Sequence, residues 1–295
     1  MKYKMESFVK GKRPTLSESS VKTYCSILKN IYKKVYGDEE IDFEKYNIHE
    51  PFLEQLKDIE CSKRKTILSA LVVVTGNEQY REAMICDIKQ TEHNNLKQEQ
   101  NEKQKANNIS KDEMEQIFKA SKKRVDEIYK DKYYSNSVLR EIQDYILLCL
   151  FYKYIAPRRA MDYMYFKIRN IDKDVDNFLD EEKEELVFNK YKTAKTYNQQ
   201  RVKCPKKLLK ILQQYIKINP TDYLLFDTNN EPLNNTKLTQ RLNKIFSKKF
   251  SINNLRHQYL SNKYQKTIET NRQLTQDLKD MGTSASQIPV YIQKI

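Results

Sequence analysis

A polar segment from Lys89 to Asn108 divides the sequence into two parts. It is built mainly from Gln, Asn, Glu and Lys and contains almost no apolar side chains. Such a segment cannot contribute to a hydrophobic core, so it predicts a linker or a solvated helix between two domains. The length of 295 residues agrees, because a chain of this size is typical of about two domains.

The composition excludes several classes of protein. Hydrophobic residues make up 39% of the chain, enough for a packed core. The longest apolar run, Tyr145 to Tyr152, is about half the length of a membrane span. Residues 1–13 lack the apolar core of a secretory signal, so we expect a protein that is not secreted and works in a cytoplasm or nucleus.

Cysteine and histidine are too few and too scattered to suggest a metal site. The five cysteines contain no CxxC pair, which is typical of reduced thiols. With three histidines and no carboxylates at ligand spacing, we expect no bound metal.

The first part of the chain is predicted to be a basic arm followed by helices. Residues 1–16 hold five basic residues against one acidic residue and predict a solvated tail. After a serine cap, apolar residues at steps of three and four from Val21 to Val35 predict an amphipathic helix that ends at Gly37. Further helices are expected at 51–59, 61–74 and 79–86, which places a helical domain at 17–88 and the linker at 89–108.

The second part, 109–295, is predicted to be mostly helical with a small sheet. Ser110 and Glu113 have the spacing of a capping box at a helix start, and a long apolar helix follows at 138–154. Short strands are expected at 178–179, 186–191 and 200–204, the first two around an acidic turn, with helices from residue 206 onward. The fold class is therefore mainly α with a small antiparallel β-sheet.

The charge balance favours a polyanionic partner. Lys and Arg number 54 against 40 Asp and Glu, a net charge of +14, which nucleic acid would neutralise most simply.

Three separated segments carry residues suited to phosphate chemistry. In Tyr154–Tyr163, Arg159 can grip two phosphate oxygens and Asp162 can brace it, although a surface ion pair is the simpler interpretation of this segment alone. In Phe188–Tyr197 a lysine can reach a DNA backbone and act as an acid, although a solvated charge run would look the same. The third segment, Ile252–Leu260, crowds Asn253, Arg256 and His257 at one turn of a helix.

The order and spacing of these segments resemble the catalytic domain of the tyrosine recombinases, the site-specific DNA integrases. The resemblance implies a catalytic domain at 109–295 and a helical, DNA-binding core-binding domain at 17–88. Pro157-Arg158-Arg159-Ala160-Met161-Asp162 resembles the family's G-x-R-x-x-E box, and Tyr191-Lys192-Thr193 resembles its hairpin lysine. Asn253-Asn254-Leu255-Arg256-His257 resembles the H-x-L-R-H box, and Met281-Gly282-Thr283 is followed eight residues later by Tyr291. The sequence patterns PRRxxDY at 157–163 and YKT at 191–193 look most like those of recombinases of large DNA viruses and their mobile elements.

The resemblance implies a role for each of these residues. Tyr291 would be the nucleophile, Arg159 and Arg256 would meet the phosphorane charge, and Lys192 would protonate the leaving 5′ oxygen. Asp162 would be the acidic partner of Arg159, and Lys195 would be the alternate to Lys192. Further contacts to DNA would come from Arg158, Lys190 and Lys195. Neither a metal nor a nucleotide cofactor is implied, and the partners would be double-stranded DNA and, as is usual in the family, three further copies in a homotetramer.

Two positions depart from the family pattern. Asn253 replaces the leading histidine and Thr283 replaces a histidine or tryptophan, so the general base is unassigned. His257 would more readily orient its neighbours than take the tyrosine proton. These departures keep two alternatives open: a type IB topoisomerase that relaxes supercoiled DNA, and a DNA-binding protein that has lost catalysis.

Overall fold

The structure is a computed structural model that describes residues 2–96 and 105–283. The chain divides into two compact units, Met1–Asn101 and Glu102–Ile295. Their hydrophobic cores are separate, since the buried side chains of the first run from Met5 to Tyr80 and the main cluster of the second runs from Ile109 to Leu255. No helix within the described ranges combines the length and apolarity needed to cross a membrane.

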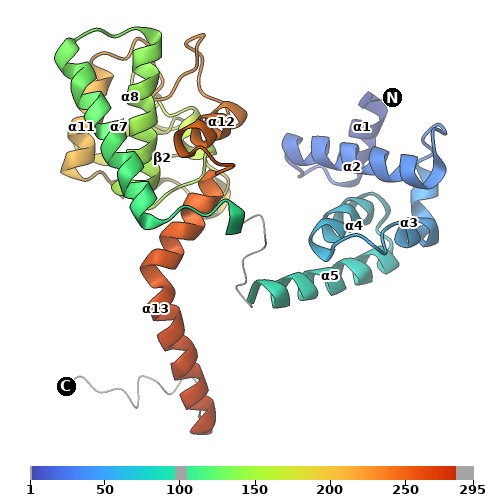
Figure 1. Cartoon of the computed structure of the whole chain (residues 1–295). Coiled ribbons are helices and arrows are strands. Elements are labelled where there is room, and N and C mark those ends of the chain that lie inside the picture. The colour runs from blue at the N-terminus through green and yellow to red at the C-terminus, as the bar shows by residue number, and fades with distance from the viewer. Residues whose placement is uncertain (1, 97–104, 284–295) are drawn as a thin grey trace. The chain divides into compact units, whose positions relative to one another are not determined.

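The first unit is entirely helical (Figure 1). Its elements are α1 (Lys2–Lys12), α2 (Glu18–Tyr36), the 3-10 turn η1 (Glu44–Asn47), α3 (His49–Gln55), α4 (Cys61–Thr75) and α5 (Glu78–Leu96). As predicted, α2 begins at a serine cap, where the Ser17 hydroxyl accepts a hydrogen bond from the Ser20 amide, and ends at Gly37. Gly37 has φ +71°, a left-handed value that glycine adopts without a steric penalty. In the core, the buried Tyr46 hydroxyl donates to the Leu28 carbonyl and so fixes η1 to α2.

The prediction of a solvated arm at residues 1–16 is wrong. Residues 2–12 form α1, which packs on α2 and α4. Met5 and Val9, four residues apart, are 1% and 0% exposed, and Phe8 stacks on Phe43 with ring centroids 4.2 Å apart. The many lysines of this segment lie on the outer side of α1, and the few apolar residues among them are the ones that face the core.

The predicted end of the fourth helix at Cys86 is also wrong. Helix α5 continues to Leu96, eight residues into the predicted linker, so this part of the polar segment is helical. A buried ion pair supports the continuation, because Asp87, 1% exposed, accepts two hydrogen bonds from the Arg64 guanidinium of α4 at 2.6 and 2.8 Å. Of the two alternatives for the polar segment, a linker or a solvated helix, residues 89–96 therefore form the helix.

The second unit is mostly helical and carries one small antiparallel sheet, which confirms the predicted fold class. Before the sheet lie α7 (Lys111–Asp131), α8 (Asn136–Leu148), the π-helical turn η2 (Cys149–Lys153) and the short α9 (Met161–Met164). After it follow α11 (Lys206–Ile216), α12 (Asn235–Phe246) and α13 (Ile252–Asp280). The capping box at the start of α7 is confirmed, with the Glu113 amide donating to the Ser110 hydroxyl and the Ser110 amide donating to the Glu113 carboxylate.

Helix α8 forms the centre of this unit. It lies side by side with α7 and contacts α11 and α12 (Figure 1). The predicted long apolar helix at 138–154 corresponds to α8 and η2 together. Arg241 of α12 holds α8 by donating to Asp144, to Gln143 and to the Arg140 carbonyl. The arginine segment, residues 154–163, follows η2 directly and stays partly in this core, because Ile155 and Tyr163 are buried in it.

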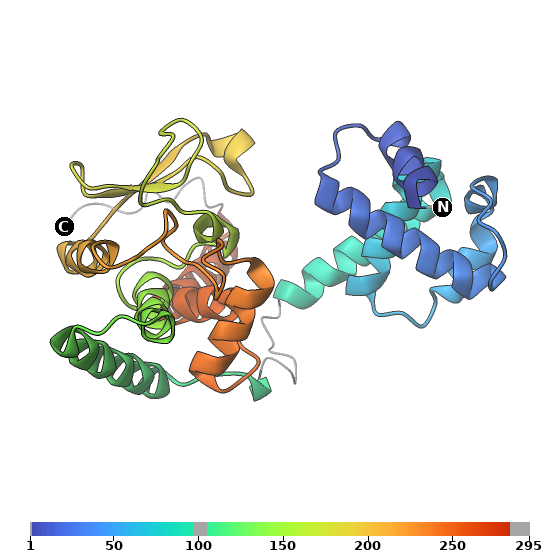
Figure 2. The same ribbon diagram turned by 90° about the horizontal axis from the view of Figure 1, so that it is seen from above.

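The sheet has the order β1-β2-β3 and lies at one edge of the unit (Figure 2). Strands β1 (Phe178–Asp180), β2 (Glu185–Phe188) and β3 (Gln200–Lys203) match the predicted positions, and the acidic turn joins the first two. Strand β2 ends three residues earlier than predicted. The amides of the next two residues, Asn189 and Lys190, donate to a side chain instead of a strand, so residues 189–199 form a loop that includes the short α10 (Ala194–Tyr197).

Candidate functional site

The arginine segment pairs Asp162 with Arg158, not with Arg159 as predicted. Arg158 Nε donates to Asp162 Oδ2 at 2.8 Å, and its Nη1 donates to Gln200 Oε1 of β3 at 2.9 Å. The guanidinium also lies over the ring of Phe188, 4.0 Å from its centroid, which is a favourable cation–π geometry. Asp162 has helical spacing to both arginines, and Arg158 takes the pair because Gln200 and the Phe188 ring also hold its guanidinium.

Asp162 is buried, with 2% of its side chain exposed. Burial raises the pKa of the Asp162 carboxyl, and the Arg158 charge and hydrogen bond oppose that rise. Its Oδ2 is held by Arg158, while its Oδ1 is buried with no hydrogen-bond partner among the described residues. The ion pair is thus a fixed part of the interior, and Arg158 is committed to it.

Arg159 has a different environment from its neighbour. Its side chain is half-buried and, in the described part of the chain, makes no hydrogen bond or ion pair of its own. Its charge acts on the nearby Asp162, and its carbonyl accepts the Asp162 amide at 3.1 Å. An arginine in this setting retains its planar set of donors for an external anion.

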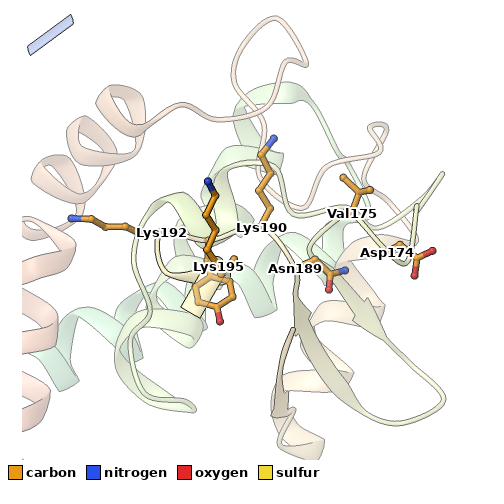
Figure 3. A pocket seen from close by; sticks show the side chains of 8 residues that line it. Asp174, Val175, Asn189, Lys190, Lys192 and Lys195 are labelled. Atoms are coloured by element: carbon orange, nitrogen blue, oxygen red, sulfur yellow. The ribbon is translucent and has the colours of Figure 1, made fainter. Parts of the chain in front are cut away.

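The lysine loop, residues 189–199, borders a hollow of about 460 Å³. Three lysines line it, Lys190, Lys192 and Lys195, together with Asp174, Val175, Asn189, Tyr191 and Ala194. In Figure 3 the side chains of Lys190 and Lys195 point the same way, while Lys192 extends in a different direction. The loop therefore concentrates positive charge at the edge of the sheet, where Lys190, Lys192 and Lys195 are all exposed.

A buried asparagine connects the lysine loop with the arginine segment, and the sequence analysis missed it. Asn177 Nδ2 donates to the carbonyls of Asp162 and Lys190, at 2.9 and 2.8 Å. Asn177 Oδ1 accepts the amides of Asn189 and Lys190, at 2.8 and 2.7 Å. Gln200, the partner of Arg158, is a second missed residue. Neither belongs to a motif, so no signal in the sequence distinguished them from surface amides.

The third segment forms the first turns of α13. Ser251 caps this helix through the Asn254 amide, and the buried Leu255 anchors it. Asn253 and His257 are exposed and Arg256 is half-buried, so all three lie at the surface of the unit near the start of the helix. Helix α13 contacts η2, the turn that leads into the arginine segment.

Thr283 is not brought together with Arg256. Helix α13 runs without a break to Asp280 and extends away from the rest of its unit (Figure 1). At about 1.5 Å per residue, roughly 36 Å of helix separate Arg256 from Asp280. Thr283 follows at the far end, where its amide donates to the Leu278 carbonyl. Tyr291 lies outside the described residues.

Within residues 2–96 and 105–283, no group of three His, Cys, Asp or Glu side chains could hold a metal ion. The expectation of no metal site stays a prediction for the whole chain.

Comparisons with known proteins give a likeness among solved structures alone. No family model matches the chain, and no curated protein matches it. Among solved structures the chain is similar to the crystal structure of XerA recombinase, with 14% sequence identity and a TM-score of 0.37. The alignment covers 88% of this chain and 82% of that one. At this level the likeness determines neither the reaction nor a viral type.

Proposed function

We propose that this protein cuts and rejoins DNA strands through a covalent link between Tyr291 and a 3′ phosphate, as a site-specific recombinase does. One observation carries the proposal. The arginine segment and the lysine loop are hydrogen-bonded into one framework, through Arg158 to Gln200 and through Asn177 to Asp162 and Lys190. A framework that ties a segment with an uncommitted arginine to a loop with three exposed lysines suits a phosphodiester.

In the proposed reaction one phosphate ester bond is exchanged for another, so no external energy source is needed. The Tyr291 oxygen attacks phosphorus in line, a P–O bond to tyrosine forms, and the P–O5′ bond breaks. Arg159 and Arg256 stabilise the negative charge of the pentacoordinate phosphorane, and Lys192 gives a proton to the leaving 5′ oxygen. The tyrosine proton goes to a base that is unassigned, since Asn253 is an amide and Thr283 an alcohol. Attack by a 5′ hydroxyl on the phosphotyrosine reverses the step.

Binding to the duplex is proposed to depend on charge. The net charge of +14 and the lysine loop favour contacts to the phosphate backbone, which give affinity and strong salt dependence but little sequence information. A homotetramer on paired DNA sites, four copies with four nucleophiles, is the assembly we propose for strand exchange.

A second candidate is a DNA-binding protein without strand-transfer activity. The position of Thr283 favours it, because this residue lies roughly a whole helix length from Arg256. In that case the lysine loop and Arg159 bind phosphate and no bond is broken.

Covalent trapping separates the two candidates. The full-length protein is incubated with nicked duplexes, with and without chelator, and an SDS-resistant protein–DNA adduct is sought. We expect an adduct that the chelator does not affect and that Tyr291→Phe abolishes. DNA binding of normal affinity without an adduct would instead establish the second candidate.

A further inference from the structure

Asn177 is a buried polar residue whose hydrogen-bonding capacity is fully used. It is 4% exposed and stands directly before β1. Its two amide protons go to the carbonyls of Asp162 and Lys190, and its oxygen accepts from the amides of Asn189 and Lys190. A side-chain amide has two donors and two acceptor lone pairs, so no other contact is left to it.

These four bonds determine where the lysine loop begins. Strand β2 ends at Phe188, so no strand ladder orients the residues that follow. Asn189 adds two bonds from its own side chain to the carbonyls of Lys173 and Asp176. The path of the chain through Lys190 is therefore set by side-chain amides, chiefly that of Asn177.

The same side chain also holds the arginine segment. The carbonyl it binds belongs to Asp162, the residue whose carboxylate pairs with Arg158. One rigid group thus spans the backbone of α9 and the backbone of the lysine loop. Moving Asn177 would change the placement of the lysine loop relative to the arginine segment through the backbone, without contacting a lysine ammonium group or the Arg159 guanidinium.

We infer that Asn177 is a positioning residue for phosphate chemistry. It aligns the lysine loop with Arg159, so that a lysine of the loop can protonate the leaving 5′ oxygen. This inference rests on the proposed strand-transfer function. Asn177 itself contacts no substrate in this scheme. Its contribution would be to the protonation step, through the placement of Lys192 and its neighbours.

The test uses a leaving group that needs no proton. A DNA duplex with sulfur in place of the bridging 5′ oxygen releases a thiolate, which is stable near neutral pH because thiols have pKa values of about 8.5. On ordinary DNA we expect Asn177→Ala to slow adduct formation by about 100-fold, the lower range for loss of a general acid. On the sulfur-substituted duplex we expect most of this defect to disappear, as it should for Lys192→Ala.

Asn219→Ala is the matched control. Asn219 is 3% exposed and stabilises its own loop, with its side chain bonded to Thr221 and Tyr223 and not to the lysine loop or α9. It should cost stability and affect both substrates alike. If Asn177→Ala also slows both substrates equally, Asn177 is only a structural residue and the inference is overturned.

A second variant and a second measurement protect the test against misfolding. Asn177→Asp keeps the size of the side chain and the acceptor for the Asn189 and Lys190 amides but loses both donors. We expect the same recovery of this variant on the sulfur-substituted duplex.

Amide hydrogen exchange should be faster at Asn189 and Lys190 in Asn177→Ala than in Asn219→Ala. Unchanged exchange would contradict the inference. If the wild-type protein forms no adduct on either substrate, the proposed function fails, and this inference fails with it.

Discussion

Arg158 and Arg159 show how adjacent residues of one type take different roles. Arg158 is bound on three sides, by Asp162, Gln200 and the Phe188 ring, whereas Arg159 keeps its donors unused within the described residues. We therefore expect the stability of the second unit to depend on Arg158 and anion binding to depend on Arg159.

We expect Arg158→Ala to lower the free energy of unfolding by about 3–5 kcal/mol, because it leaves the Asp162 charge buried without its partner. Arg159→Ala should change stability by about 0.5 kcal/mol or less and still abolish adduct formation. Urea titrations of both variants, with adduct assays in parallel, check this. A large loss of stability in Arg159→Ala would reverse the assignment.

Asp162 gives a pH dependence with a defined sign. Because burial raises the pKa of its carboxyl, the folded state binds a proton more tightly than the unfolded state from about pH 4 up to the raised value. This group therefore makes folding less favourable as the pH rises through that window. We expect the free energy of unfolding of the wild type, relative to Asp162→Asn, to fall across it and then level off. Urea titrations at several pH values measure the difference, and a rise with pH would mean that the pKa of Asp162 is lowered.

At the scale of elements, the lysine loop and α13 contain several of the predicted site residues. The loop is a connection between strands that is fixed by side-chain amides, and α13 is a helix whose two ends hold different parts of the predicted site. Each element makes a separate prediction.

We expect the lysine loop to account for several phosphate contacts. Replacing Lys190, Lys192 and Lys195 together by Gln should reduce the slope of log affinity against log salt by about 2–3, at about 0.9 per contact. Replacing three exposed lysines of α7, Lys119, Lys123 and Lys130, is the control with the same change of charge. Fluorescence anisotropy with a labelled duplex across a series of salt concentrations measures both slopes. Equal reductions would show that the loop is not the contact surface.

The length of α13 predicts how Tyr291 reaches the arginines. Thr283 lies beside Leu278, whose carbonyl accepts its amide, so the chain has eight residue steps left to reach Tyr291. Eight steps span at most about 29 Å, less than the roughly 33 Å of helix between Leu278 and Arg256. We therefore expect a second copy to supply the tyrosine. Mixing Arg256→Ala with Tyr291→Phe, each inactive alone, should form an adduct on the Arg256→Ala chain, identified by a size tag. An inactive mixture, when each variant is active with wild type, would show that each chain uses its own tyrosine.

At the scale of the whole molecule, the chain has two separate cores. Residues 1–101, expressed alone, should give a helical circular-dichroism spectrum and a cooperative thermal transition, because this core uses no residue of the second unit. Removing residues 1–12 from this fragment should lower its midpoint, since Met5 and Val9 would leave the core exposed. A fragment that lacks a cooperative transition would show that the first unit depends on the second.

The sequence by itself determined the fold class, most helix positions and the three strands. These depend on local patterns, namely apolar spacing along a helix, the Ser17 and Ser110 caps, and short apolar runs beside turns. In α1 and at the end of α5 the apolar residues are sparse, and the polar composition led to wrong predictions. A few apolar side chains, or one ion pair with a buried carboxylate, decide whether such a polar segment packs on the core.

Only the tertiary structure decided the arrangement of the candidate site. The pairing of Asp162 with Arg158, the bridge made by Asn177 and the distance along α13 each depend on residues far apart in the chain or on where a helix begins and ends. The spacing of a motif predicts which side chains can take part in a site. The spacing does not predict which of two adjacent arginines turns inward. That choice depends on the Phe188 ring and the Gln200 amide, which pack against Arg158.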